Sequence, residues 1–354
     1  MTKISNMSTG HKIAIWALTP GGLSIAKNLL QHIKQSSLFL SETSDDSIEG
    51  MRFKRLSEAV SSHFRRFHGH IFLMSAGIVV RVIAPHIRHK TTDPAVVVVD
   101  DAGKFAISLL SGHLGGANEL AHSVARLTGG IPVITTATDV NKVPAIDMIA
   151  GRKNLVIENP DAIKIVNMGF LKKQKIRLHD PYNLLHGLIP EFYLDDSPSW
   201  NDDTPAVVVD DKAAEHTKNT LFLRPKTLSA GIGCNRGTSA EELKGFLWDV
   251  CKEHGISVHS IRWLATIELK KDEQGITDLA RELGVPVRFY DSRTLDQVGT
   301  IENPSDYAKK YTGARSVCEA AAILASDSGT LIVPKKKTPN VTIALARKKI
   351  FCMS

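Results

Sequence analysis

The residues most able to do chemistry gather in one stretch, residues 108–118, with the sequence SLLSGHLGGAN. Its apolar start has strand character, and its glycines lead into a segment with helical spacing. His113 is the side chain in this stretch that can serve as a base near neutral pH. Backbone N–H groups at a helix start attract anions, and glycines allow a ligand to approach. The stretch predicts either an anion site or a tight strand-to-helix turn in which His113 caps backbone.

Two further glycine turns follow predicted strands, at Thr19-Pro20-Gly21-Gly22 and at residues 229–233, SAGIG. Ligands of open α/β sheets bind outside the carboxyl ends of strands, so both turns are candidate ligand contacts. Either one can also be only a turn. Their glycine spacing matches neither the phosphate loop nor the dinucleotide fingerprint, which leaves a nucleotide site as the least favoured hypothesis.

Ionisable residues also stand at the ends of predicted strands: Lys90, Asp93, Asp139, Asp147, Glu268 and Lys270. Such groups are candidates for acid–base catalysis, but helix caps and salt bridges use the same residues. His86 and His89 have the i, i+3 spacing of metal ligands, yet no third ligand is in view, so a solvent-facing helix end is favoured.

Two segments near the C-terminus leave similar alternatives. Cys318 and Glu319 open a predicted helix, whose positive end would lower a thiol pKa, but without a nearby His a small buried cysteine is favoured. Lys335, Lys336 and Lys337 lie between two predicted strands. They form either a solvated hairpin tip or a grip for a carboxylate-rich ligand.

The elements that must position these residues are predicted from apolar runs and helical spacing. Before residue 150 we expect strands at 12–18, 70–76, 96–99, 104–109 and 131–136, and helices at 23–34, 57–67, 77–85, 115–127 and 144–150. The turn Asp100-Asp101-Ala102-Gly103 is typical of a hairpin. After residue 227 we expect strands at 228–234, 263–269, 285–290, 330–333 and 341–346, and helices at 238–254, 275–283 and 316–325.

Between these two regions the pattern weakens. Strand-like pieces at 155–157, 192–194 and 206–209 alternate with polar stretches. We therefore expect an α/β protein with two α/β domains, residues 11–150 and 227–350. Their mainly parallel sheets are joined by a smaller, less regular middle segment, residues 151–226. Thr238 and Glu241 have the form of a capping box at the start of the helix after residue 237.

Composition excludes several classes of protein. The chain has 354 residues, enough for two or three domains, and 43% hydrophobic with 23% charged residues is typical of a folded globular protein. Its net charge of +7 suits a partner with several carboxylates or phosphates and does not by itself indicate nucleic acid. No apolar run reaches the ~18 residues of a membrane helix. The polar N-terminus and four scattered cysteines predict a cytoplasmic protein with reduced thiols.

Several motifs together resemble the CbiG family of cobalamin-biosynthesis proteins, the cobalt-precorrin-5A hydrolases. They are TTDPAVVVVDDAGKFAISLLSGHLGGANELA with IPVITTATD, and then LSAGIGCNRGTSAEE, ATIELKKDE, SVCEAAA and VPKKKTPNVTIALAR. The resemblance covers residues 14–150 and 228–347, and the middle segment matches loosely. Glu268 stands where the family pattern has Asp, and Asn235 where a basic residue is common.

The resemblance implies a hydrolase of anaerobic vitamin B12 biosynthesis. Such an enzyme opens the δ-lactone of cobalt-precorrin-5A and releases acetaldehyde to give cobalt-precorrin-5B. It implies no organic cofactor and no metal of the protein's own, because the macrocycle accepts the electron pair and the substrate carries the cobalt. The expected partners are this cobalt-containing tetrapyrrole, other enzymes of the corrin pathway and a second copy of the chain, with no nucleic acid and no membrane.

On this basis we assign His113 as the base, with Asp139 and Asp93 orienting the base or the water. The backbone of Gly115 and Gly116 would meet the oxyanion. Lys90 and Arg81 would hold carboxylates of the substrate. The remaining predicted substrate contacts are Gly21, Gly22, Gly77, Ser111, Asn118, Gly231, Gly233, Glu268, Lys270, Glu319, Lys335 and Lys337.

A second hypothesis belongs to a different class. The C-terminal domain resembles a protein that stands alone in the aerobic pathway, so the whole chain could be a non-catalytic carrier or chaperone of a corrinoid intermediate. Release of acetaldehyde discriminates between the two hypotheses, because a carrier releases none above background.

Overall fold

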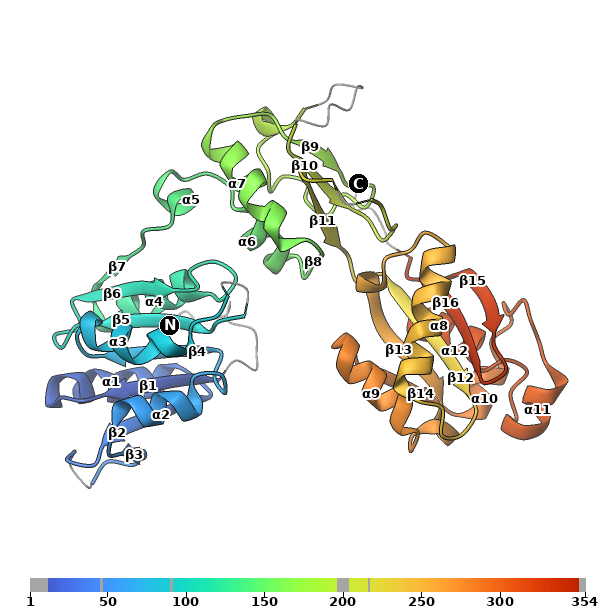
Figure 1. The fold of residues 1–354 in the computed structure, drawn as a ribbon, viewed down its shortest axis with the longest axis horizontal. Helices are drawn as coiled ribbons and strands as arrows, with labels where there is room; N and C mark the ends of the chain where they lie inside the picture. The colour runs from blue at the N-terminus through green and yellow to red at the C-terminus, as the bar shows by residue number, and fades with distance from the viewer. Residues whose placement is uncertain (1–11, 45–46, 90–91, 196–203, 216, 350–354) are drawn as a thin grey trace. The chain divides into compact units, whose positions relative to one another are not determined.

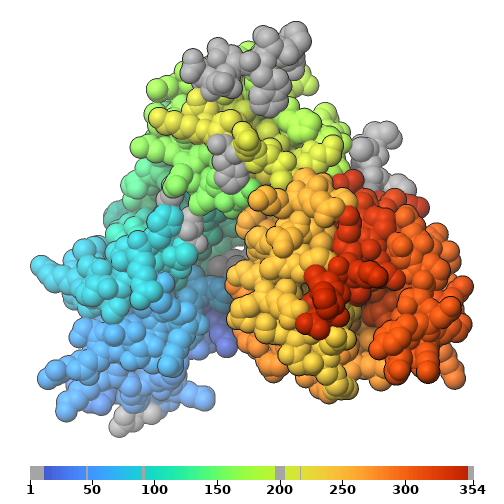
Figure 2. All heavy atoms as spheres, turned by 45° about the vertical axis from the view of Figure 1, so that its right-hand side comes forward, coloured from blue at the N-terminus to red at the C-terminus, as the bar shows by residue number. Residues whose placement is uncertain are grey.

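The computed structural model describes residues 12–44, 47–89, 92–195, 204–215 and 217–349 (Figure 1). The chain clusters into two compact units, Met1–Met148 and Ile149–Ser354. The described strands form three separate sheets, one in the first unit and two in the second, and most neighbouring strands run parallel. Figure 2 shows that each part of the colour range stays together, so each sheet with its helices is built from a continuous stretch of chain. The expected α/β fold with mainly parallel sheets is confirmed.

The first unit holds a seven-stranded sheet in the order β3-β2-β1-β4-β5-β6-β7. Its strands are β1 (Ile13–Ala17), β2 (Ser36–Ser41), β3 (Met51–Phe53), β4 (Gly69–Leu73), β5 (Ala95–Val99), β6 (Phe105–Leu110) and β7 (Ile131–Val133). Strands β2 and β3 were not predicted. Both are partly polar, and their strand conformation depends on pairing: β2 pairs with β1 on one side and with the three-residue edge strand β3 on the other.

Helices cover both faces of this sheet, which explains why its central strands are apolar along their whole length. In β1, the side chains of Ile13 and Ile15 pack with α1 (Pro20–His32) and α4 (Ala117–Thr128). The alternate side chains, Ala14 and Trp16, pack with α2 (Leu56–His63) and α3 (Ala76–Ile83). Because helices bury both faces, a site can form only where the strands end and the loops begin. Below, "edge" means either of these two sides of the sheet.

The direction of the sheet reverses between β5 and β6. The Asp100 side chain accepts hydrogen bonds from the N–H groups of Ala102 (3.2 Å) and Phe105 (2.6 Å), and Gly103 takes a φ of +69°. This turn makes β5 and β6 the predicted antiparallel hairpin, while β7 runs parallel to β6. Strands β1–β5 therefore end at one edge of the sheet, and β6 and β7 end at the opposite edge.

His70 is buried on the face of the sheet that α2 and α3 cover. His70 is fully buried, accepts a hydrogen bond from Trp16 Nε1 (3.1 Å) and donates one through Nε2 to the carbonyl of Phe64 (3.0 Å). Stacked rings of Trp16, Phe64 and Phe72 surround it. Burial lowers the pKa of His70 to about 4, since the charged imidazolium would lose its hydration.

The middle segment is itself a small α/β unit, with sheet order β8-β11-β10-β9. Its strands are β8 (Val156–Ile157), β9 (Arg177–His179), β10 (Ala206–Val209) and β11 (Thr220–Arg224), and its helix is α7 (Ile163–Leu171). The strand expected at 192–194 is wrong, because Glu191–Tyr193 is a 3₁₀ turn that buries Tyr193. The apolar run of β11 was not predicted, although it is buried throughout.

The C-terminal domain has a five-stranded sheet in the order β14-β13-β12-β16-β15. Its strands are β12 (Leu228–Cys234), β13 (Ile261–Ile267), β14 (Val287–Tyr290), β15 (Thr330–Lys337) and β16 (Val341–Arg347). Helices α8 (Ala240–Glu253) and α9 (Gln274–Leu283) pack on one face and α12 (Cys318–Ala325) on the other, with α10 (Ser292–Asp296) and α11 (Asp306–Thr312) between β14 and α12. Ser239, and not Thr238, caps α8 by accepting from the Glu242 N–H.

Two buried arginine contacts join the middle sheet to the C-terminal domain. The fully buried Arg224 pairs with Glu158, whose carboxylate also accepts from Ser257 Oγ (2.9 Å). Asp211 binds Arg347 through two 2.8 Å hydrogen bonds, in the bidentate geometry that Arg and carboxylate favour. These contacts make the second unit one piece. No helix formed by the described residues is long and apolar enough to span a bilayer.

We expect His70 to make the first unit sensitive to acid. Its pKa is lower in the folded than in the unfolded chain, so its stabilising contribution is complete above pH 6.5 and is lost as the pH falls toward 4. The loss amounts to about 1.4 kcal/mol for each pH unit in this window. His70→Gln can still accept the Trp16 N–H but cannot take up a proton, so its stability should fall less between pH 6.5 and 4.

Urea unfolding at several pH values, followed by hydrogen exchange of peptides from β1 and β4, measures this difference. His122→Gln, at an exposed position on α4, is the matched control and should keep the wild-type pH dependence. Equal slopes for the His70 variant and the wild type would contradict the assignment.

Gly231 should be among the least replaceable residues of the C-terminal domain. A Cβ at this position would lie 1.8 Å from the Cys318 carbonyl oxygen, because α12 packs directly on β12. Gly231→Ala is therefore expected to destabilise the domain by about 3 kcal/mol. Gly245, in the middle of α8, has open space around its Cβ position, and Gly245→Ala should stabilise by about 1 kcal/mol. Urea midpoints of the two variants test both signs, and a tolerated alanine at 231 would refute the packing argument.

Candidate active site

His113 lies between two carboxylates that come from different elements. The loop after β6 carries His113, α5 (Ala137–Val140) carries Asp139, and the first turn of α6 (Ile146–Arg152) carries Asp147. His113 Nδ1 is 3.0 Å from Asp147 Oδ2, and His113 Nε2 is 3.0 Å from Asp139 Oδ2. Thr138 Oγ1 is also 3.0 Å from Nε2. The three ionisable groups form a continuous Asp–His–Asp chain, which can pass a proton along its hydrogen bonds.

This chain runs from the protein interior to solvent. The exposed side-chain fractions are 7% for Asp147, 14% for His113 and 43% for Asp139. The hydrogen bond that the ring donates to Asp147 raises the pKa of His113, and burial acts in the opposite direction. The charge of Asp147 and the hydrogen bond and charge of Asp139 add to the increase, so the pKa is raised overall. The ring is therefore held as imidazolium to a higher pH than a free histidine, and the group that meets solvent directly is Asp139.

The His113 loop is a tight turn, as expected, but the expectation that His113 caps backbone is wrong, because its ring contacts the side chains of Asp147, Asp139 and Thr138. Ser111 has a φ of +57°, a conformation that serine rarely adopts, and its Oγ is buried without a hydrogen-bond partner among the described residues. A Cβ on Gly115 would lie 2.3 Å from the Ser111 Cβ, so the loop closes only with glycine there. Packing thus requires Gly115, and the φ of +84° favours glycine at 116, whether or not a ligand binds.

The start of α4 is less open to an anion than its sequence implied. The N–H of Gly116 donates to the carbonyl of His113 (2.8 Å), and the N–H groups of Ala117 and Asn118 donate to Ser111 and Gly112. Gly116 is therefore not available as an oxyanion donor. The N–H of Gly115 has no acceptor in the described part of the chain and remains the candidate donor.

Asn118 supports the Asp139 carboxylate from behind. It is buried, and its Nδ2 donates to Asp139 Oδ2 (3.1 Å) and Thr136 Oγ1 (2.7 Å). Its Oδ1 in turn accepts from Ser108 Oγ (2.7 Å). This network fixes the amide orientation, so Asn118 acts as a positioning residue for Asp139 where a substrate contact was predicted.

Asp93 has other partners than His113. Its carboxylate is almost fully buried and binds Arg65 Nη2 (3.3 Å) and the N–H of Arg88 (2.9 Å). These contacts occupy both oxygens, and the predicted role of Asp93 in orienting the base has no support in this geometry. The predicted carboxylate ligand Lys90 lies outside the described residues.

Four other predicted contacts lie at the opposite edge of the same sheet. Gly21 and Gly22 follow β1, and Gly77 and Arg81 belong to α3, which follows β4. The anion at the start of α1 is the protein's own Asp101, which contacts Thr19 and accepts from the Gly22 N–H (3.0 Å). The Arg81 guanidinium donates back to the Gly77 carbonyl (3.3 Å). These residues are separated from His113 because β6 reverses the direction of the sheet.

In the C-terminal domain, two predicted contacts serve packing instead. Gly231 allows α12 to lie against β12, and Gly233 lies against Thr342 of the neighbouring strand. Glu319 is fully buried and accepts hydrogen bonds from the N–H groups of Glu302, Asn303 and Lys335 and from Asn303 Nδ2. Burial acts to raise its pKa, but these four donors outweigh it and the pKa of Glu319 is lowered.

The remaining predicted contacts share one edge of the C-terminal sheet. Glu268 and Lys270 follow β13, and Lys335 and Lys337 lie within β15, so the expected hairpin tip is wrong. Lys270 pairs with Glu273 (3.2 Å), Lys335 Nζ donates to the Asn303 carbonyl (2.9 Å), and Glu268 pairs with Lys271. Lys337 is exposed. Glu268 and Lys270 are thus already paired within the domain, whereas Lys335 contacts a neutral carbonyl.

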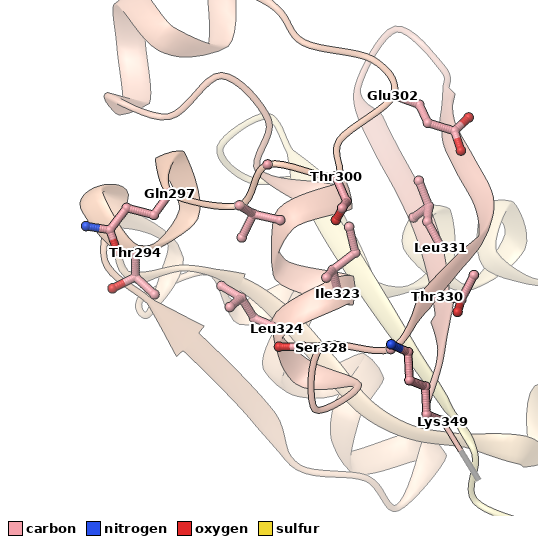
Figure 3. A pocket seen from close by; sticks show the side chains of 13 residues that line it. Thr294, Gln297, Thr300, Glu302, Ile323, Leu324, Ser328, Thr330, Leu331 and Lys349 are labelled. Carbon is pink, nitrogen blue, oxygen red and sulfur yellow. The ribbon is translucent and has the colours of Figure 1, made fainter. Parts of the chain in front are cut away.

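A cavity of about 620 Å³ lies elsewhere in the C-terminal domain, between the loop after α10, the end of α12 and the start of β15 (Figure 3). Hydroxyl and amide groups of Thr294, Gln297 and Thr300 line it together with Ile323 and Leu324. None of the predicted site residues belongs to it. In the part of the chain that the structure describes, no group of three or more His, Cys, Asp or Glu side chains is arranged to hold a metal ion.

Three family models match consecutive parts of the sequence. They are "Cobalamin synthesis G N-terminal" over residues 58–139, "Cobalamin biosynthesis central region" over residues 144–225 and "Cobalamin synthesis G C-terminus" over residues 228–346. The chain is 37% identical to the cobalt-precorrin-5A hydrolase of Priestia megaterium, over 94% of each chain. The chain belongs to the cobalamin synthesis G family.

A second hydrolase agrees with this assignment. The cobalt-precorrin-5A hydrolase of Salmonella typhimurium is 32% identical over 95% of this chain and 97% of its own. A solved structure of CobE, a protein of the cobalamin biosynthetic pathway, is 40% identical over 34% of this chain and 89% of its own, with a TM-score of 0.33. His113 and Asp139 lie in or at the end of the part matched by the N-terminal family model, and Asp147 lies in the part matched by the central one.

Sequence reasoning identified Asp147 as an ionisable residue but assigned it no role. The only sequence signal was its place after Pro144, close to the TTATD motif. Thr138 and Ser108, which complete the hydrogen bonds around His113 and Asn118, were not identified. Their side chains are ordinary in type, and only the folded chain shows where they point.

We expect Asp147 to control the protonation of His113 in this member of the cobalamin synthesis G family. Asp147→Asn removes the buried carboxylate, so the raised pKa of His113 should fall toward its ordinary value. Asp139→Asn should cause a smaller fall, because Asp139 is more exposed and its hydrogen bond and charge act less strongly. NMR titration of the His113 ring measures both shifts.

Asp101→Asn, at the opposite edge of the sheet, is the control and should leave the His113 titration unchanged. The direction in which His113 changes the folding stability with pH also follows. Because the folded pKa is raised, the contribution of His113 is complete below pH 6.5 and disappears as the pH rises through the folded pKa. An unchanged pKa of His113 in Asp147→Asn would disprove the assigned chain.

Proposed function

We propose that this protein is a cobalt-precorrin-5A hydrolase, which opens the δ-lactone of cobalt-precorrin-5A and releases acetaldehyde to give cobalt-precorrin-5B. The observation that carries the proposal is its 37% identity to a cobalt-precorrin-5A hydrolase over 94% of both chains. The Asp147–His113–Asp139 chain supports it independently, since lactone hydrolysis needs a group that removes and returns protons.

The exposed Asp139 and the His113 Nε2 share one proton and act as a single acid–base pair. In the first step this pair takes a proton from water as the water oxygen bonds to the lactone carbonyl carbon. The N–H of Gly115 faces the resulting oxyanion. The acyl C–O bond then breaks, and the same pair returns the proton to the departing alkoxide, which leaves a carboxylic acid and a hydroxyl group.

In the second step the pair removes the proton of that hydroxyl group. The oxygen forms a C=O bond, the neighbouring C–C bond breaks, and its electron pair passes into the macrocycle while acetaldehyde leaves. Asp147 keeps the imidazole ring oriented and stabilises its positive charge throughout, as a buried carboxylate does for a catalytic histidine. Since the macrocycle accepts the electron pair and brings the cobalt, the mechanism requires no other cofactor. We place this reaction in the cytoplasm.

The single-variant test is His113→Ala, measured by acetaldehyde release from cobalt-precorrin-5A. Loss of a general acid–base group should lower turnover by about 10²–10⁴-fold. A His113 that only capped the turn would instead leave turnover intact and lower the stability by about 1 kcal/mol, which a melting curve measures. His122→Ala, an exposed histidine on the adjoining helix α4, should match the wild type in both measurements.

Two results would count against the proposal. Near-normal turnover in His113→Ala would remove His113 from the mechanism while leaving the reaction itself in place. Binding of the corrinoid by the wild type without acetaldehyde above background would favour the carrier hypothesis. The similarity of about a third of this chain to CobE is the observation that favours this second candidate.

A further inference from the structure

The segment that leads into β5 lies directly against the His113 loop. The carbonyl oxygen of Asp93 would be 3.3 Å from a Cβ on Gly115, and the strand pairing places Val96 opposite Leu110. The start of β5 and the end of β6 therefore form one surface at this edge of the sheet. The residues around Asp93 therefore border the loop that carries His113.

Asp93 holds two arginines of this surface in place. Arg65 follows α2 and reaches Asp93 Oδ1 with its Nη2, which also donates to the carbonyl of His86 (3.0 Å). Arg88 precedes β5, and its backbone N–H donates to Asp93 Oδ2. The buried carboxylate thus fixes the guanidinium of Arg65 and the backbone of Arg88, while the side chain of Arg88 extends from an exposed position.

The arginines have donors to spare. Both side-chain hydrogen bonds that Arg65 makes with described residues use Nη2. Among these residues Nη1 and Nε have no acceptor and can bind a ligand, and the side chain is 38% exposed. Arg88 makes no ion pair with any described residue. The buried carboxylate of Asp93 balances the charge of one of the two arginines. Arg65, Arg88 and Asp93 together therefore carry a net positive charge beside the His113 loop.

We infer that Arg65 and Arg88 form a binding site for a peripheral carboxylate of the tetrapyrrole substrate, and so position its macrocycle against His113 and Asp139. The inference rests on the proposed function and assigns the substrate-holding role to residues that the sequence did not indicate. Guanidinium groups suit this task, because they are always charged and bind carboxylates through paired hydrogen bonds. Arg81, the arginine predicted from sequence, lies at the opposite edge and bonds to its own helix.

The experiment compares two cobalt corrins with the full-length protein. Cobyrinic acid carries free carboxylates around the ring, and cobinamide carries amides in their place. Arg88→Gln should weaken the binding of cobyrinic acid about tenfold, as loss of a charge-assisted hydrogen bond does, and leave cobinamide binding unchanged. The effect should shrink at high salt. With cobalt-precorrin-5A, the KM should rise about tenfold with kcat unchanged.

Arg126→Gln is the matched control, an exposed arginine in the last turn of α4 that has no assigned role, and should bind both corrins as the wild type does. Arg65→Lys keeps the charge opposite Asp93 and should give a smaller loss than Arg88→Gln. The inference fails if Arg88→Gln behaves like Arg126→Gln, or if it weakens both corrins equally. Failure of the proposed function is a separate result, since the wild type would then release no acetaldehyde while the two corrins could still be compared.

Discussion

The turn after β5 is the constraint on which the arrangement of the first unit depends. Asp100 binds the backbone N–H groups of the turn, and Gly103 supplies the left-handed conformation that closes it. β6 then returns antiparallel to β5, and β7 follows its direction. Two loops with similar glycine-rich sequences consequently reach opposite edges of the sheet. Because an edge is the only part of the sheet that helices leave uncovered, this reversal decides which residues can share a site.

The two edges have different electrostatic character. At the edge where β1 ends, Asp101 occupies the positive start of α1, so the helix is already neutralised by the protein itself. At the edge where β6 ends, the start of α4 is closed by carbonyls of its own loop, and the free charges belong to side chains. There a histidine between two carboxylates lies beside a surface that carries two arginines. The hydrogen-bonded Asp–His–Asp side chains therefore lie at the edge where β6 ends, and this is also the edge where we propose that a carboxylate binds.

In the C-terminal domain, two motifs of the family contain residues that the packing of the domain requires. The LSAGIG motif contains Gly231 because α12 approaches β12 too closely for any side chain. The SVCEA motif contains Glu319 because three backbone N–H groups and one side-chain amide need an acceptor in the interior. A buried carboxylate with four donors is stabilised as an anion and ties the loop at 302–303 to β15 and α12. Both residues hold the shape of the domain, and neither has an open face toward a ligand.

Local patterns in the sequence were sufficient for most of the architecture. Apolar runs identified β1, β4, β5 and β12, the Asp100 turn identified the hairpin, and the glycine block identified the loop of His113. The partly polar strands β2 and β3 were not predicted, because pairing with their neighbours and not their own composition makes them strands. The site was only partly predicted. His113 and Asp139 carried visible signals, but Asp147, 34 residues from His113 along the chain, and Arg65, 28 residues before Asp93, meet their partners only in the folded protein. Residue type and spacing predict contacts between residues of one element. How the elements pack decides the direction of each strand and which distant side chains come into contact.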